Sequence, residues 1–323
     1  MYKVIDIKDI EGISIGQEEN REAGTGCTVI LADTEMAAGL DVRGGGPASR
    51  ESELLNPLAS AQTIHAIVLA GGSAYGLGAA DGVMKYLEER GRGLRVDNMV
   101  IPLVCQSDIF DLTCGDHRVR PDIEMGYRAC VNSEKNNYRD GNYGVGCGAT
   151  VGKVLGMGRC MKSGIGSYAI DCEEFKIGAI AVVNAFGDVY DETGKMIAGV
   201  LTEDKQGLDN TVRIMNVLNE TNSGFAGNTT LGVIITDARF DKSRLCKIAG
   251  MGHNGYARSI RPVHTSMDGD SIYAVSVGDN AANSDFAGTL GALVMTRAIE
   301  KAVKSAEASY GYPAHKDIVK NQC

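Results

Sequence analysis

Six short hydrophobic runs recur along the chain and predict β-strands: KVIDI (3–7), CTVILA (27–32), AIVLA (66–70), IGAIAVV (177–183), LGVIIT (231–236) and SIYAVSV (271–277). Several are apolar at every position, which is typical of strands covered on both faces. Three longer segments, 75–91, 243–258 and 285–308, show the spacing of amphipathic helices. Strands and helices that alternate in this way predict a layered body of sheets and helices.

Two segments lack such a pattern. Residues 112–146 mix Gly, Asn, Asp and charged residues, and we expect a long surface excursion there. Residues 218–228, LNETNSGFAGN, are polar and poor in apolar anchors, which predicts a flexible loop and a plausible site of proteolytic nicking.

Composition excludes several classes of protein. A net charge of −9 and a pI near 5.2 argue against nucleic-acid binding, which needs a basic face. The chain has no apolar run long enough for a transmembrane helix, and its N-terminus lacks the pattern of a signal peptide. The nine cysteines are odd in number, irregularly spaced and without a CxxC pair, which favours reduced thiols in the cytoplasm over disulfides.

The familiar cofactor and metal motifs do not fit. The segment AIVLAGGSAYGLGAADG (66–82) follows a strand and opens a helix, but its glycines match neither dinucleotide nor P-loop patterns. A close turn or a backbone wall of a substrate pocket is the better interpretation. The five histidines are far apart, and Asp268 and Asp270 begin no complete calcium loop, so we expect neither metal nor cofactor.

The junction GNTTLGVIIT raises a different possibility. A threonine hydroxyl needs a nearby base, and a threonine that becomes an N-terminus carries one in its own α-amine. Thr229 could reach that state if its hydroxyl attacked the carbonyl of Asn228 and the resulting ester were hydrolysed. From these residues alone, an ordinary junction between a loop and a strand remains the preferred interpretation.

Several long motifs, in order, resemble the self-cleaving L-aminopeptidase/D-esterase family, which includes β-peptidyl aminopeptidases and nylon-oligomer endo-hydrolases. The motifs that carry the resemblance cover most of the chain: RGGGPASRESELLNP (43–57), AIVLAGGSAYGLGAADGVMKYLEERGRG (66–93), IPLVCQSDIFDL (101–112), VGCGATVGK (145–153), KSGIGS (162–167), IGAIAVVNAFGDV (177–189), GNTTLGVIITDA (227–238) and MGHNGYARSIRPVHTSMDGDSIYAVSVG (251–278).

The resemblance implies a single domain over residues 1–323 with the four-layer αββα sandwich of the DOM fold, which is similar to Ntn-hydrolases. It implies self-cleavage between Asn228 and Thr229 into associated fragments 1–228 and 229–323. It also implies hydrolysis of small peptides, amides, esters or amide oligomers, and a homo-oligomer, commonly a tetramer of processed protomers.

The family's functional residues map onto this chain by motif. Thr229 matches the nucleophile and Asn184 the amide that stabilises the oxyanion, while Asp268 and Asp270 match the carboxylates that tune the nucleophile. Lys162 is the preferred catalytic lysine, and Lys153 is the alternative. A separate set is assigned to substrate binding: Gly71, Gly72, Ser73 and Tyr143.

Departures from the family pattern leave the substrate open. The chain has KSGIGS and GCGAT where the family usually has KGGIGS and GAGTG, so Cys147, Ala149 and Ser163 alter the expected pocket. Cys147 is interpreted as a wall residue. Two other functions remain as alternatives: an acyltransferase like the ornithine acetyltransferases, and a non-catalytic nucleotide-binding protein that uses residues 71–78.

Overall fold

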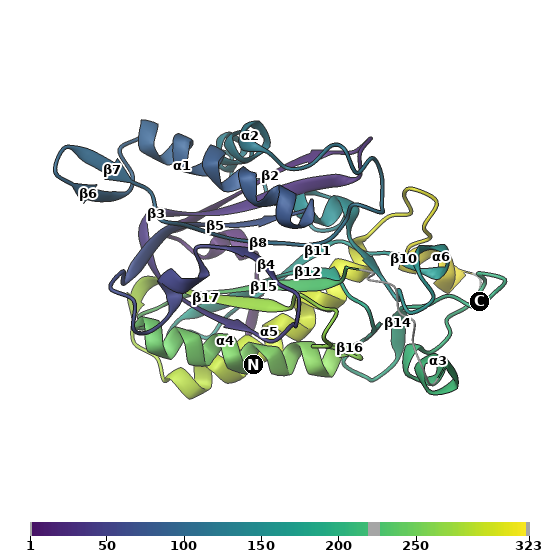
Figure 1. Ribbon diagram of the computed structural model, residues 1–323. Helices are drawn as coiled ribbons and strands as arrows, with labels where there is room; N and C mark the ends of the chain where they lie inside the picture. Colours follow the sequence, from purple (N-terminus) through teal and green to yellow (C-terminus); the bar gives the residue numbers. More distant parts are fainter. Residues whose placement is uncertain (1, 219–226, 321–323) are drawn as a thin grey trace.

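The structure is a computed structural model that describes residues 2–218 and 227–320 (Figure 1). The helices are α1 (Ala79–Glu89), α2 (Ile123–Ser133), α3 (Thr211–Leu218), α4 (Lys242–Ser259), α5 (Ser284–Ser305) and α6 (His315–Lys320). The strands are β1 (Lys3–Ile5), β2 (Ile13–Asn20), β3 (Thr25–Val42), β4 (Ala48–Arg50), β5 (Thr63–Ala70), β6 (Leu94–Val96), β7 (Met99–Ile101), β8 (Val104–Asp108), β9 (Thr150–Val151), β10 (Met161–Lys162), β11 (Ile165–Asp171), β12 (Lys176–Asn184), β13 (Asp188–Tyr190), β14 (Met196–Ala198), β15 (Thr229–Ala238), β16 (Ile260–Arg261) and β17 (Ser271–Asn280). Short 3-10 turns complete the list: η1 (Ile7–Asp9), η2 (Ser52–Leu55), η3 (Ser73–Gly78), η4 (Gly144–Gly148) and η5 (Met157–Arg159).

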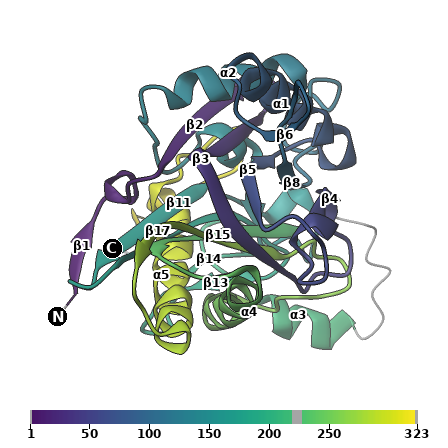
Figure 2. The ribbon, with the colours of Figure 1, turned by 90° about the vertical axis from the view of Figure 1, so that its left-hand side faces the viewer.

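The long strand β3 joins two layers of sheet. Its C-terminal half pairs with β17 in the order β1-β11-β12-β15-β17, and its N-terminal half pairs with β2 and with β5, which continues to β8 and β4. The pairing with β5 shifts register between Leu31 and Met36, where the strand passes between the layers. Helices α1 and α2 cover the outer face of one layer, and α4 and α5 cover the other (Figures 1 and 2).

Three separate hydrophobic cores follow from these four layers. One lies between α4, α5 and the sheet, one between the two sheet layers, and one under α1 and α2. Neighbouring residues of a strand point into different cores: Ile234 of β15 belongs to the helix-side core, whereas Val233 and Ile235 belong to the core between the layers. This alternation explains why the predicted strands are apolar at every position, and it confirms the αββα architecture.

All six predicted strands and all three predicted helices are present. The prediction for 112–146 was wrong in part, because Ile123–Ser133 forms α2 and packs against α1 and β2. The face of α2 that packs inward is built from small side chains, Gly126, Ala129 and Cys130, so it lacks the large apolar stripe that marks a helix. The expected flexible loop 218–228 falls mostly on residues 219–226, which lie outside the described residues.

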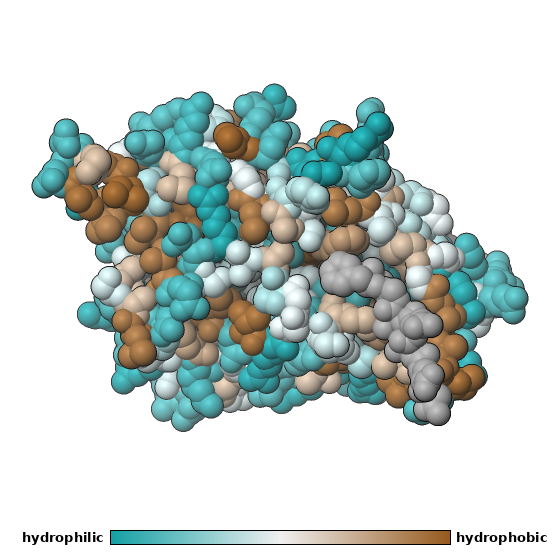
Figure 3. All heavy atoms as spheres, in the orientation of Figure 1, coloured by the Kyte–Doolittle hydropathy of each residue, from teal (hydrophilic) through white to brown (hydrophobic). Residues whose placement is uncertain are grey.

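The hairpin β6–β7 projects from one end of the molecule (Figure 1). Its residues Leu94, Val96, Met99 and Ile101 are exposed hydrophobics, and brown residues gather at this end in Figure 3. Within the described chain, no helix is long and apolar enough to cross a membrane.

Candidate active site

The topology brings three distant segments to the start of β15. Strand β12 is antiparallel to β15, so it ends where β15 begins, and its last residue, Asn184, pairs with Thr229. Strand β17 is parallel to β15, so both begin at the same edge, and Asp268 just before β17 forms a bridge with Asn228. Asn184, the Asn228–Thr229 junction and the DGD segment therefore meet at one place.

The peptide bond between Asn228 and Thr229 is buried and held from both sides. Asn228 and Thr229 are 2% and 4% exposed. The hydroxyl of Thr229 donates to the Asn228 carbonyl, and the backbone N–H of Gly269 donates to the same oxygen at 2.9 Å. A Cβ at residue 269 would lie 2.7 Å from Thr229 Oγ1, so glycine at this position leaves room for the hydroxyl.

Asp268 and Asp270 flank this peptide bond from the loop before β17. Asp270 Oδ1 accepts the N–H of Thr230 at 2.7 Å, and its Oδ2 accepts the backbone N–H of His264 at 3.1 Å. Asp268 Oδ2 accepts the N–H and the hydroxyl of Thr265 at 3.0 and 2.5 Å. Burial raises the pKa of Asp268 to about 6, and the neighbouring Asp270 contributes to the rise.

The glycine motif at residues 43–47 forms the wall behind this loop. A Cβ on Gly44 would lie 2.3 Å from both the Asp268 carbonyl and the Asp270 N–H, and Gly46 N donates to the Asp268 carbonyl at 2.9 Å. Glycine at position 44 is therefore explained by close backbone packing against the site.

The side chain of Asn184 is fixed by hydrogen bonds at both ends of its amide. Its Oδ1 accepts from Lys153 Nζ at 2.8 Å and from Thr150 N at 3.1 Å, while its Nδ2 donates to the Phe110 carbonyl at 3.1 Å. These donors and acceptors determine the orientation of the amide. The second N–H of Nδ2 is the group that could bind a developing oxyanion.

Lys153, the alternative lysine, is the one in contact with the other candidates. Its backbone N–H donates to the Phe186 carbonyl, just beyond β12, and its ammonium reaches Asn184 and, at 3.4 Å, the Gly227 carbonyl. Burial lowers the pKa of Lys153 to about 8. An ammonium here adds positive charge beside the Asn228–Thr229 bond.

The preferred lysine, Lys162, is placed differently. Its ammonium donates to the carbonyls of Gly146, Ala149 and Ser163 at 3.1, 2.9 and 2.6 Å, and these bonds use all three of its N–H donors. Its contacts hold the η4 turn together, whereas Lys153 is the lysine that contacts Asn184.

The turn Gly71–Gly72–Ser73 is connected to the site through the segment 109–111. Gly72 N donates to Asp111 Oδ1 at 2.7 Å, and Ser73 N donates to the Ile109 carbonyl at 3.0 Å. Phe110 lies between Ile109 and Asp111 in the chain. Its carbonyl accepts a hydrogen bond from Asn184 Nδ2, and its ring packs against Gly227. The turn thus supports the 109–111 segment, which in turn contacts the site.

Tyr143 lies in another part of the surface. Its ring packs against the guanidinium groups of Arg21 and Arg139, with Arg139 at 3.9 Å from the ring centre. It lines a cavity of about 350 Å³ together with Cys147 and Tyr310. Thr229 and the other candidate catalytic residues do not line this cavity, so the geometry does not support a direct role of Tyr143 at the nucleophile.

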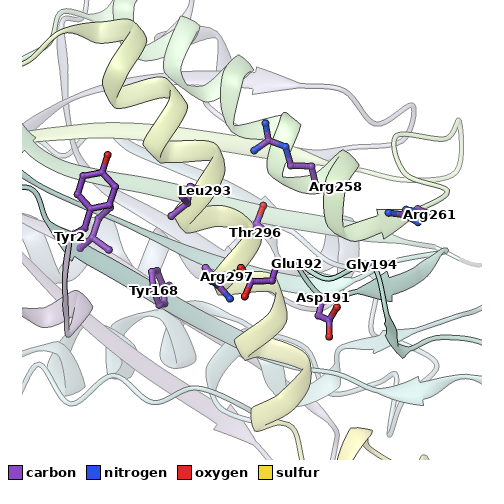
Figure 4. A pocket seen from close by; sticks show the side chains of 11 residues that line it. Tyr2, Tyr168, Asp191, Glu192, Gly194, Arg258, Arg261, Leu293, Thr296 and Arg297 are labelled. Atoms are coloured by element: carbon purple, nitrogen blue, oxygen red, sulfur yellow. Dashed lines mark ion pairs between the residues drawn. The ribbon is translucent and has the colours of Figure 1, made fainter.

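A larger cavity, about 530 Å³, lies on the side of α5 (Figure 4). Leu293, Thr296 and Arg297 of α5 line it, and Arg297 forms an ion pair with Glu192. It contains none of the candidate catalytic residues. Among the described residues, no group of three or more His, Cys, Asp or Glu side chains is placed to hold a metal ion.

The chain matches peptidase family S58 over residues 6–316. It belongs to this family. An uncharacterized aminopeptidase of Mycobacterium leprae is 37% identical over 290 residues, which cover 84% of this chain and 78% of that protein. A 6-aminohexanoate-oligomer endohydrolase of Paenarthrobacter ureafaciens is 31% identical over 280 residues, which cover 84% of this chain and 74% of that protein.

Solved structures support the same architecture. A β-aminopeptidase of Burkholderia sp. superposes with a TM-score of 0.69 at 17% identity, over 99% of this chain and 95% of that one. An L-aminopeptidase D-Ala-esterase/amidase of Ochrobactrum anthropi, described as a variant of the Ntn-hydrolase fold, gives a TM-score of 0.70 at 16% identity, over 98% of this chain and 92% of that one. The S58 protein is therefore a peptidase, an enzyme that hydrolyses amide bonds, with an Ntn-hydrolase-like fold.

Several residues of the site were not identified from the sequence. Phe110 and Gly269 contribute a backbone carbonyl, a backbone N–H and space, which leave little signal in residue type. His264 precedes MDGD within a recognised motif, so the motif itself was the available signal.

Proposed function

We propose that this S58 peptidase is made as a precursor that cleaves itself between Asn228 and Thr229 and then uses Thr229 as an N-terminal nucleophile. One observation carries the proposal: the Thr229 hydroxyl lies against the Asn228 carbonyl, whose oxygen is already held by Gly269 N–H. The substrates we propose are small peptides, amino-acid amides or esters, and amide oligomers.

This geometry supports the following course of self-cleavage. Thr229 Oγ attacks the carbonyl carbon of Asn228, and Gly269 N–H stabilises the negative charge that develops on the oxygen. The C–N bond breaks, the nitrogen takes up a proton as the new α-amine, and an ester links Asn228 to Thr229. Water hydrolyses the ester, which yields fragments 1–228 and 229–323.

The processed enzyme would use the same groups on its substrate. The freed α-amine of Thr229 accepts the hydroxyl proton, and the oxygen attacks the substrate carbonyl. Asn184 binds the oxyanion, Lys153 fixes Asn184, and Asp268 and Asp270 orient the new N-terminus. Water then releases the acid from the acyl-enzyme.

The names of two relatives indicate which substrates to test. One relative is named an aminopeptidase and another a 6-aminohexanoate-oligomer endohydrolase, and both kinds of activity are cleavage of an amide bond. A screen of α-, β- and D-aminoacyl amides beside amide oligomers would select among them. Transfer of the acyl group to an added amine faster than hydrolysis would point to an acyltransferase instead.

The test of the proposal is a denaturing gel with intact-mass analysis. The wild-type protein should give two fragments, the smaller beginning at Thr229, and Thr229→Ala should remain one chain and hydrolyse no substrate. Thr230→Ala is the matched control, because the Thr230 hydroxyl has no hydrogen-bond partner among the residues that the structure describes and should be dispensable. A wild-type chain that stays whole after long incubation would contradict the proposal.

We also propose that processed protomers assemble into a homo-oligomer, with a tetramer as the expected state. The exposed apolar side chains of the β6–β7 hairpin support a protein contact there. Light scattering coupled to size-exclusion chromatography measures the state directly. The eight cysteines in the described part of the chain are free thiols, which supports a cytoplasmic location.

A further inference from the structure

The His264 ring, which contacts Asp270 Oδ2, lies against two other aromatic rings. His264 lies in the loop between β16 and β17, and His253 and Tyr256 come from α4. The two histidine rings are 4.7 Å apart between centres at an interplanar angle of 73°, and the rings of Tyr256 and His264 are stacked at 5.8 Å. Tyr256 is fixed in turn, because its hydroxyl donates to the Ser271 carbonyl at 3.2 Å.

His264 binds a single oxygen of Asp270 twice. Its backbone N–H and its ring Nδ1 contact Asp270 Oδ2 at 3.1 and 2.8 Å. The other oxygen, Oδ1, accepts the N–H of Thr230, the residue after the nucleophile. Asp270 is thus held between His264 and the start of strand β15. Its two oxygens cannot exchange places without breaking all three hydrogen bonds.

The contact also indicates which ring nitrogen of His264 carries the proton. An ionised carboxylate only accepts, so Nδ1 must carry the proton. Among the described residues, Nε2 is buried and has no hydrogen-bond partner, although the His264 side chain as a whole is 17% exposed. The hydrogen bond that the ring makes within the described chain is therefore directed at Asp270.

The backbone of His264 is unusual as well. Its φ is +59°, a left-handed conformation that non-glycine residues rarely adopt. Such conformations persist where surrounding contacts impose them, and they gather at functional sites. Here the conformation lets the N–H and the ring of one residue reach the same oxygen.

Few charges face the His264 ring from the elements around it. Asp270 contacts it directly, and Asp268 follows four residues later in the same loop. From α4 it meets His253, whose pKa is lowered to about 4, chiefly by burial, and Tyr256, whose pKa burial raises well above its usual range. Beyond His253 lie Asp41, which accepts from His253 Nε2 through its backbone carbonyl at 3.1 Å, and Arg43.

We infer that His264 is a positioning residue, which clamps Asp270 through Nδ1–H so that the carboxylate meets the start of β15 in one orientation. The inference rests on the proposed function, in which Asp270 orients the N-terminus of Thr229. Within the described chain, the hydrogen bonds and ring contacts of His264 are to Asp270, His253 and Tyr256 and not to Thr229. Its loss should slow the chemical step and leave substrate binding nearly unchanged.

Two amide variants separate the hydrogen bond from mere packing. In His264→Asn the side-chain NH₂ can occupy the place of Nδ1 and still donate to Asp270, and asparagine tolerates positive φ. In His264→Gln the amide reaches instead toward the place of Nε2. We expect His264→Asn to keep kcat within about threefold, and His264→Gln and His264→Ala to lower kcat by about 10- to 100-fold at nearly constant KM, as for loss of a hydrogen bond to a charged group.

The measurements are kcat and KM of the processed protein, the rate at which the Thr229 N-terminus appears, and the melting temperature of each variant. Should His264→Ala fail to fold, the Asn and Gln pair alone carries the comparison. Equal kcat for the Asn and Gln variants, whether both high or both low, would overturn the positioning role, because a structural role alone does not distinguish them at matched stability.

Asp270→Asn distinguishes failure of the inference from failure of the proposed function. If Asp270→Asn is inactive while His264→Gln matches the wild type, the clamp is dispensable and the proposed function stands. If Asp270→Asn and Thr229→Ala both keep wild-type hydrolysis, the proposed function is wrong. His315→Gln serves as a distant control, because that ring contacts the Ile197 carbonyl and should leave kcat unchanged.

Discussion

At the scale of single residues, this site depends on backbone groups as much as on side chains. Gly269 supplies an N–H to the Asn228 carbonyl and an open space beside the Thr229 hydroxyl. Phe110 supplies a carbonyl to Asn184. Because any residue type has a backbone, such roles are nearly invisible in a single sequence, whereas the hydroxyl, amide and carboxylate partners could be predicted from their chemistry.

Gly269→Ala should slow self-cleavage by about tenfold or more. The new Cβ would lie 2.7 Å from Thr229 Oγ1 and 3.0 Å from the Gly46 carbonyl, so the hydroxyl or the loop must shift. The measurement is the appearance of the Thr229 N-terminus with time. Gly46→Ala is the matched control, because its nearest contact is at 3.9 Å, and it should process at the wild-type rate. Unchanged processing in Gly269→Ala would contradict the packing argument.

The lowered pKa of Lys153 predicts how the rate of self-cleavage depends on pH. Its folded pKa of about 8 lies below the usual lysine value, so its positive charge is present below pH 8 and is lost as the pH rises through that value. We therefore expect the rate of self-cleavage to fall above pH 8, since the charge that supports the developing oxyanion disappears.

The precursor is the right species for this measurement, because Thr229 has no free amine before cleavage. Lys153→Met should be slower by about 10- to 100-fold below pH 8 and should lack the decline above it. Lys162 has a similarly lowered pKa, so Lys162→Met tests the assignment: the decline should persist. A decline that vanished in Lys162→Met alone would return the role to Lys162.

Among the helices and strands, the hydrophobic pattern predicted some elements and missed others. The central strands and the helices α4 and α5 could be predicted, because each buries a continuous or periodic apolar surface. Strand β2, with the sequence ISIGQEEN, and helix α2 were missed. Helix α2 packs inward through the small residues Gly126, Ala129 and Cys130. In β2 the buried apolar alternation is limited to Ile13 and Ile15, so neither element carries an extended apolar pattern.

The contact between α1 and α2 shows this and can be tested. A Cβ on Gly82 would lie 1.9 Å from the Ile123 carbonyl, so the helices approach there through glycine. Gly82→Ala should lower the free energy of unfolding by about 1–3 kcal/mol, the usual cost of overpacking. Gly78→Ala, at the start of the same helix, has no neighbour within 4 Å and should not destabilise the protein. Denaturant unfolding of the pair measures the difference, and equal stability would contradict it.

At the scale of the whole molecule, the proposed cleavage divides the sequence but not the cores. Strand β15 of fragment 229–323 lies between β12 of fragment 1–228 and its own neighbour β17, which in turn pairs with β3. The core between the layers contains Ile30 and Ile180 from the first fragment and Val233 and Tyr273 from the second. Cleavage at one end of β15 removes none of these contacts.

The two fragments should therefore remain together after cleavage. Native mass spectrometry should show an assembly whose mass is that of the 34.1-kDa chain plus one water for each protomer, while denaturing conditions should separate the fragments. Thr229→Ala gives the uncleaved reference. Dissociation of the fragments in native buffer would show that the bond itself, and not the packed cores, holds the halves together.

The amino-acid sequence was enough to predict the layered fold, the resemblance to the family and the groups that carry the proposed chemistry: Thr229, Asn184, Asp268 and Asp270. These predictions depend on the spacing of hydrophobic residues and on residue type, and both can be seen in a short stretch of sequence. Only the folded chain shows that Lys153 contacts Asn184 whereas Lys162 binds carbonyls around the η4 turn. It also places Tyr143 at a separate cavity and His264 against Asp270. Each of these depends on which strand ends and turns become neighbours in space, a property of the assembled sheet that no local stretch of sequence contains.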